Sequence, residues 1–101
     1  MADIARKELL AGLRSLRPKL EREGVTSLVL FGSRARGENR VDSDIDVMID
    51  IAEGRKFSLL DLAGVAHQIE DSFGLPANIF MRRSLDSEFL AEARKSGITV
   101  F

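Results

Sequence analysis

The sequence predicts an α/β sandwich, in which a small mixed β-sheet of about four strands is flanked by helices. Segments with apolar residues every three or four positions, typical of helices, alternate with short apolar runs rich in Val, Ile, Leu and Phe, typical of strands. The predicted order is helix, strand, loop, strand, helix, strand, helix, strand. No repeat or linker interrupts it, so we expect residues 1–101 to form a single domain.

The first predicted element is a helix over 3–23. Its leucines at positions 9, 13, 16 and 20 recur with helical spacing. Asp3 is a candidate N-cap, and Gly24 is expected to end the helix. Pro18 should break or kink it near Leu16.

Two strands follow, separated by a polar loop. The run 25–31 is almost continuously apolar, which predicts a central strand. The loop 32–39 is rich in glycine and charge and has room for one helical turn. In the run 45–51 isoleucines and valine alternate with Asp46, Met48 and Asp50, which predicts a strand with one apolar and one mostly acidic face. Met48 is expected to serve packing.

A second long helix is predicted from a capping box. Ser58 is followed three residues later by Asp61, and Gly74 should end the helix. Its predicted inward stripe consists of Leu59, Leu62, Ala66, Ile69 and Phe73.

The last three elements are short. A strand is expected over 77–81, a helix over 86–95, and an edge strand over 98–101. Gly97 should stop the last helix. Its predicted inward residues are Phe89, Leu90 and Ala93.

Composition excludes several classes of protein. Hydrophobic residues make up 45% and charged residues 31%, as in a folded globular chain. No apolar run approaches the ~20 residues of a membrane helix, so we expect no membrane contact. The formal net charge of −1 provides no general attraction to nucleic acid, and direct nucleic-acid binding is not expected. The absence of cysteine excludes disulfides and thiolate zinc sites, and a cytoplasmic location is the default expectation.

The candidate functional residues lie at the end of the first predicted strand and at the start of the second, on either side of the loop between them. Alternate residues of a strand point to one face, roughly 6–7 Å apart, so Asp44 and Asp46 can hold one hard cation between them. Magnesium (Mg²⁺) is usually bound by one or two carboxylates together with substrate phosphates. Gly32 allows close backbone approach, and Ser33 with nearby N–H groups can donate to phosphate oxygens. The pattern predicts a site for Mg²⁺ and a polyphosphate.

Three arginines in the loop, Arg34, Arg36 and Arg40, outnumber its one acid and suit a polyphosphate. We assign Arg36 to the nucleotide. Simpler interpretations stay open: the arginines could belong to a solvated loop, the glycines to ordinary turns, and the Asp-x-Asp pair to a solvent-facing edge. Asp50 lies ~13 Å along the strand from Asp46, too far to share a cation, and is expected to be solvated. His67, the only histidine, is expected to be structural or on the surface.

These motifs resemble the polymerase β-like nucleotidyltransferase superfamily, and specifically its small members, the minimal nucleotidyltransferases. The similarity covers nearly the whole chain, including the loop 32–37, the strand 43–47 and the helix start 57–62. It implies the nucleotidyltransferase fold, Mg²⁺ with ATP or another nucleoside triphosphate as ligand, and transfer of a nucleotidyl group. It also implies Gly32 and Ser33 on the triphosphate, and Asp44 and Asp46 as catalytic metal ligands.

The resemblance also implies a partner. Minimal nucleotidyltransferases are commonly paired with a HEPN-domain protein in toxin–antitoxin modules, where the transferase is the antitoxin and either AMPylates or binds the toxin. A chain of this length leaves no room for an acceptor-binding domain. The acceptor is therefore expected on another protein, or else a second subunit completes the site in a homo-oligomer.

One position departs from the family pattern. The family usually has a third acid on the next strand, and Asn78 stands there in this chain. Adjacent strands lie ~4.8 Å apart, so position 78 can reach the metal site. Its amide oxygen can bind Mg²⁺ but cannot accept a proton from an attacking hydroxyl, and loss of a general base typically costs about 10²–10⁴-fold in rate.

Three interpretations follow from this position. The first is an enzyme that transfers AMP to a hydroxyl on its partner, and the second is a catalytically impaired protein that acts by binding its partner. A nucleotide sensor without a partner is the third.

Overall fold

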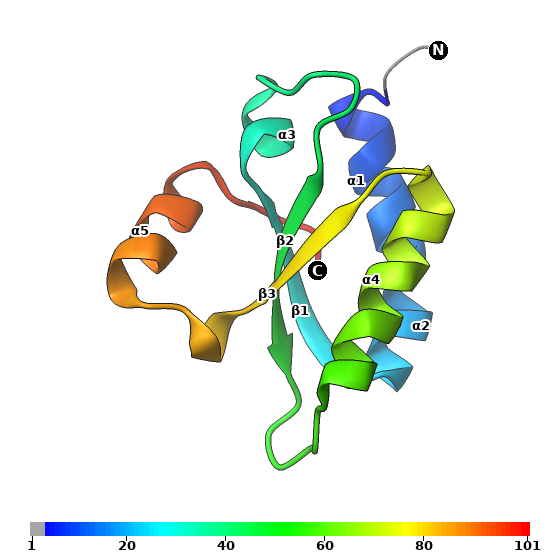
Figure 1. Ribbon diagram of the computed structural model, residues 1–101, viewed down its shortest axis with the longest axis vertical. Helices are drawn as coiled ribbons and strands as arrows, with labels where there is room; N and C mark the ends of the chain where they lie inside the picture. The colour runs from blue at the N-terminus through cyan, green and yellow to red at the C-terminus, as the bar shows by residue number, and fades with distance from the viewer. Residues whose placement is uncertain (1–3) are drawn as a thin grey trace.

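The computed structural model, which describes residues 4–101, contains one four-stranded sheet with helices on both faces (Figure 1). The strand order is β3-β2-β1-β4. β1 is antiparallel to both β2 and β4, while β2 and β3 are parallel, so the sheet is mixed as predicted. The strands are β1 (Val25–Phe31), β2 (Ile45–Ile51), β3 (Ala77–Met81) and β4 (Ile98–Thr99).

The helices follow the predicted order, except that the first predicted helix is divided into two. The leading helix is two helices that meet at Leu16, and Pro18 lies in the first turn of the second, where a missing N–H group is tolerated. The predicted N-cap Asp3 lies outside the described residues, and the N-cap position is taken by Ala5. The helices are α1 (Arg6–Ser15), α2 (Arg17–Arg22), α3 (Ser33–Arg36), α4 (Leu59–Phe73), the 3-10 turn η1 (Arg82–Ser84) and α5 (Ser87–Ser96).

Each face of the sheet has its own core. α1, α2 and α4 cover one face, where Ile45, Val47 and Ile49 of β2 are buried, and α5 covers the other (Figure 1). On the second face Met48 is buried in a smaller core with Phe31 of β1, which confirms the expectation that it serves packing. This core isolates the two acids of β2 at opposite ends of the strand.

α4 packs differently from the predicted stripe. Its buried residues are Val65, which the prediction omitted, and Ile69. Leu59 was predicted to face inward but is 82% exposed, and its neighbour Leu60 is 83% exposed. The helix contacts the core through its middle turns, so its first turn lies beside the edge strand β3 instead of over the core.

The predicted capping box at the start of α4 is present. The Asp61 carboxylate accepts the Ser58 backbone N–H at 2.8 Å, and the Ser58 hydroxyl oxygen accepts the Asp61 N–H at 3.3 Å. The hydrogen bonds from Ser58, first from its backbone and then from its hydroxyl, lower the pKa of Asp61 below its ordinary value. The charged carboxylate therefore stabilises the folded chain.

We expect Asp61→Asn to cause a small loss of stability at neutral pH. Because the folded pKa is depressed, the contribution of Asp61 is fully present above the ordinary value of 3.8 and is lost as the pH falls through the lower folded pKa. The difference between wild type and variant in urea denaturation should therefore shrink on acidification. Asp71→Asn is the matched control: it removes a carboxylate near the end of the same helix, where the macrodipole disfavours negative charge, and should not destabilise.

In the part of the chain that the structure describes, no helix is long and apolar enough to cross a membrane.

Candidate functional site

The register between β1 and β2 brings Gly32 and Ser33, which follow β1, close to Asp46 of β2. Phe31, the last residue of β1, pairs with Asp46 of β2. Gly32 and Ser33 follow directly, so the loop starts beside the Asp46 carboxylate. Ser33 begins the short helix α3 and is half-buried.

Gly32 is required by this close approach. Its backbone has φ +76°, and a Cβ atom at this position would lie 2.5 Å from Oδ2 of Asp46. Only glycine combines the positive φ with the space that the carboxylate occupies. Gly37 has a similar φ of +74° but nothing within 4 Å of the corresponding point, so it is an ordinary turn glycine that ends α3.

The next strand adds Asn78. The parallel register of β2 and β3 places Asn78 opposite Asp46. The Asn78 amide nitrogen donates to Oδ2 of Asp44 at 3.0 Å and to Oδ1 of Asp46 at 2.9 Å. Two carboxylate oxygens thus converge on one point that holds a partially positive group. The Asp46 carboxylate lies between this amide and Gly32.

Asp50 and His67 lie away from this cluster. Asp50, expected to be solvated, has a partly exposed side chain, and its Oδ1 atom lies 3.3 Å from Nε of Arg82, with which it forms an ion pair. His67 is exposed on α4. Over residues 4–101, no group of three or more His, Cys, Asp or Glu side chains could hold a metal ion. Asp44 and Asp46 are two carboxylates, and the third polar side chain of their cluster is the Asn78 amide, which is not an acid.

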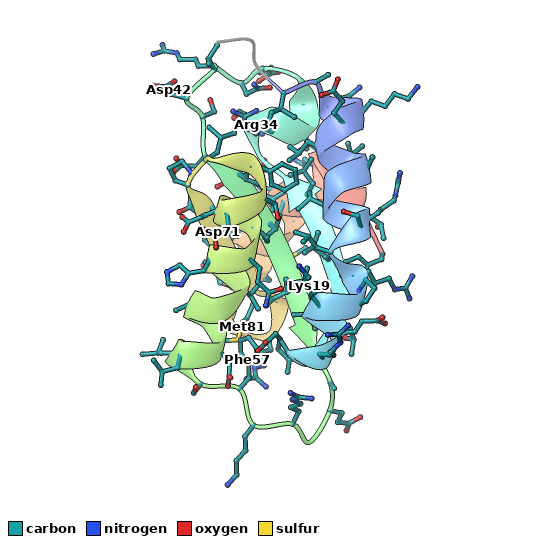
Figure 2. All side chains as sticks on the ribbon, turned by 90° about the vertical axis from the view of Figure 1, so that its right-hand side faces the viewer. Lys19, Arg34, Asp42, Phe57, Asp71 and Met81 are labelled. Carbon is teal, nitrogen blue, oxygen red and sulfur yellow. The ribbon has the colours of Figure 1, made fainter. Side chains whose placement is uncertain are left out.

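Arg34, one of the three loop arginines whose charge suits a polyphosphate, is only 2% exposed, so its side chain lies in the protein interior. Its guanidinium donates to the backbone carbonyls of Ser43 at 2.9 Å, Val41 at 3.1 Å and Arg40 at 3.4 Å. Figure 2 shows Arg34 at the same end of the molecule as Asp42 of this loop. Arg34 thereby fixes the segment that leads into Asp44.

Arg36 and Arg40, in contrast, are exposed. Nε of Arg36 lies 3.0 Å from Glu38 Oε2. Arg36 also lines a hollow of about 190 Å³ beside Gly32, whose walls include the rings of Phe31 and Phe89. These two rings meet edge to face, with centroids 6.0 Å apart. Of the three arginines, Arg36 therefore borders an open space next to the Gly-Ser loop.

We expect Arg34→Met to reduce the free energy of unfolding by about 2–4 kcal/mol, because it removes a buried charged donor from three backbone carbonyls. Arg36→Met is the matched control, since this side chain is exposed, and should change stability by no more than about 0.5 kcal/mol. Urea denaturation of both variants measures the difference. Equal effects would show that Arg34 does not hold the loop.

Known proteins are similar to this chain in sequence and in fold. Residues 8–99 match the family described as the nucleotidyltransferase domain. Protein adenylyltransferase MntA of Thermococcus cleftensis is 35% identical over 88 residues, which are 86% of this chain and 87% of that protein. A solved structure assigned to the minimal nucleotidyltransferases is 33% identical with a TM-score of 0.69, over 88% of this chain and 93% of that one.

A more distant structure shares the fold. It is a complex from Shewanella oneidensis between a tri-AMPylated HEPN toxin and an MNT antitoxin, matched at 15% identity and a TM-score of 0.64 over 91% of this chain and 71% of that one. The predicted fold is thereby confirmed. With a family match over most of its length and relatives above 30% identity, the chain belongs to the nucleotidyltransferase domain family, as a minimal nucleotidyltransferase.

Proposed function

We propose that this chain transfers AMP from Mg²⁺–ATP to a hydroxyl group on a partner protein. The observation that carries the proposal is the convergence of Asp44, Asp46 and Asn78 beside the close-packed Gly32. The name of the MntA relative, a protein adenylyltransferase, supports the same reaction class. We further propose that the partner is a HEPN-domain toxin and this chain its cytoplasmic antitoxin, by analogy with the Shewanella oneidensis complex.

The Asp pair fits a small divalent cation. Two carboxylate oxygens lie within 3.0 Å of the Asn78 amide nitrogen, so they already converge on one positively polarised group. Carboxylate oxygens are the ligands that Mg²⁺ prefers. Rotation of the amide would present the Asn78 oxygen to the same point. When bound, Mg²⁺ supplies charge neutralisation for the phosphates and for the attacking oxygen.

The remaining residues bind and orient the nucleotide in this proposal. Ser33 and the loop N–H groups donate to the phosphates, and Arg36 borders the hollow beside Gly32 where part of the nucleotide can lie. The acceptor hydroxyl loses its proton to water and its oxygen forms a bond to the α-phosphorus, while the bond to the bridging α–β oxygen breaks and pyrophosphate leaves. Positioning and charge stabilisation carry most of such a reaction.

A second candidate function is neutralisation of the partner by binding alone. Asn78 favours it, because an amide cannot take the proton that the acceptor hydroxyl loses. The Asn78 amide also donates hydrogen bonds to both carboxylates at once, so both acids have a hydrogen-bond partner without an added positive charge. A nucleotide site could then persist while transfer is slow.

The test is label transfer to the protein encoded beside this one. We expect ATP labelled at the α-phosphate to label that protein in the presence of Mg²⁺, while ATP labelled at the γ-phosphate should not. A chelator should abolish the label. Neutralisation of the partner without any label would overturn the transfer proposal and favour binding alone.

We expect Gly32→Ala to lower the transfer rate by about 10- to 100-fold, because its Cβ would displace the Asp46 carboxylate and small misplacements are costly in catalysis. Gly37→Ala is the matched control. It adds a methyl group to a second positive-φ glycine of the same loop, where the methyl group meets no neighbouring atom, although the ψ of Gly37 is 20° and that of Gly32 is −160°. Rates and Mg²⁺–ATP binding of both variants should be compared. Equal losses would mean that backbone strain, and not contact with Asp46, is responsible.

A further inference from the structure

β3 forms one edge of the sheet, and part of its backbone is directed outward. In a parallel ladder, alternate residues bond to the same neighbour. The Pro76 carbonyl accepts the Ile45 N–H at 2.8 Å, which assigns Asn78 to the side bonded to β2 and Ile79 to the free edge. The N–H group of Ala77 is taken by Glu70 at 3.0 Å. Ile79 is thus the centre of an edge that can accept another strand.

A groove of about 380 Å³ runs beside this edge. Its α4 wall consists of Leu59, Leu62, Ala63 and Ala66, and its floor of residues 77–80 of β3. The lining is apolar except for Asn78, so the groove adjoins the candidate active site at that residue. Leu59, 82% exposed, forms part of its rim.

We propose that this groove seats the acceptor: an extended segment of the partner protein pairs with the free edge of β3 and delivers its hydroxyl group beside Asn78. This inference rests on the proposed function and specifies how its protein substrate binds. Continuity between the groove and the Asp44–Asp46–Asn78 cluster identifies the occupant, because the acceptor must reach that cluster to react. Strand addition to a free sheet edge is a common mode of peptide recognition.

The strand geometry also defines the chemical class of the segment. Successive side chains of a strand point to opposite faces. Ile79 faces the core side with α4, whereas Asn78 faces the side of the acids. A segment paired with β3 therefore places one side chain in the apolar groove and its neighbour beside Asn78. The preferred acceptor is an apolar residue directly next to a hydroxyl-bearing one, in extended conformation.

The first test uses two adjacent exposed leucines. Leu59 lines the groove and Leu60 does not, although their exposures are nearly equal. We expect Leu59→Glu to raise KM for the protein acceptor at least 10-fold while Mg²⁺–ATP binding is unchanged, and Leu60→Glu to change it less than 2-fold. Equal effects of the two variants, or no effect of either, would overturn the inference.

The second test examines the strand pairing without requiring transfer. Binding of the neighbouring-gene product should slow hydrogen exchange of the Ile79 amide at least 10-fold, and Leu59→Glu should weaken the complex more than Leu60→Glu in calorimetry. If label transfer fails but both results hold, the docking site stands and the transfer proposal falls. If transfer is robust while the Ile79 amide stays unprotected, the docking site falls alone. A dimer of this chain that Leu59→Glu dissociates would assign the groove to a second copy and also overturn the inference.

Discussion

Asn78→Asp should raise the rate of AMP transfer to the partner by about 10²–10⁴-fold, the range that a positioned general base typically contributes. The substitution keeps the size of the side chain and replaces the amide nitrogen by an oxygen. That oxygen would lie near the carboxylates of Asp44 and Asp46, where the wild-type nitrogen lies 3.0 and 2.9 Å from them. A carboxylate there can accept the proton of an attacking hydroxyl, which an amide cannot. Single-turnover rates with labelled ATP measure the gain.

The same variant should become dependent on metal for stability. Without a cation, three carboxylates would face one another, so Asn78→Asp should have a lower melting temperature than wild type in chelator. Added Mg²⁺ should raise its melting temperature more than that of wild type, because binding to the folded state stabilises it. Asn78→Ala is the control, since it removes the amide without adding a charge, and it should show neither gain. An Asn78→Asp variant no faster than wild type would mean that position 78 does not limit the reaction.

The strands could be predicted closely because their signals are local. The bounds of β1, β2 and β3 agree with the predicted runs, since each run is apolar or alternating and ends at glycine or polar residues. The capping box of Ser58 and Asp61 is likewise a short-range pattern and is present as predicted. β4 is shorter than the predicted 98–101. The meeting of the Asp pair with position 78 could be expected from strand spacing, although its hydrogen bonds could not.

The difference in exposure between the loop arginines could not be predicted, because it depends on tertiary contacts. Arg34 and Arg36 are two residues apart in the same short helix, yet one is buried and one exposed. Burial of Arg34 depends on carbonyls at 40, 41 and 43, whose positions follow from how the loop returns to β2. No local signal in the sequence distinguishes these two arginines. The ion pair of Asp50 with Arg82 similarly depends on η1 crossing the end of β2.

Asp46→Asn should lower AMP transfer by more than about 100-fold, since even changes that only reorient metal ligands cost about 10–100-fold. The substitution preserves the shape of a side chain that lies between Gly32 and Asn78, so the fold should survive. It removes one of the two negative charges expected to hold Mg²⁺, and the Mg²⁺ concentration needed for half-maximal rate should rise. Label transfer across a Mg²⁺ titration measures both effects.

Asp50→Asn is the matched control for this experiment, because Asp50 lies on the same face of β2 and is paired with Arg82 outside the cluster. It should change the rate less than about 3-fold and stability by less than about 1 kcal/mol, as expected for a solvent-accessible ion pair. Equal losses in both variants would indicate a general effect of charge on β2 and would remove Asp46 from the proposed site. If Asp46→Asn stops transfer but the partner is still neutralised, transfer and neutralisation are separate properties. The chain would then act on its partner chiefly by binding.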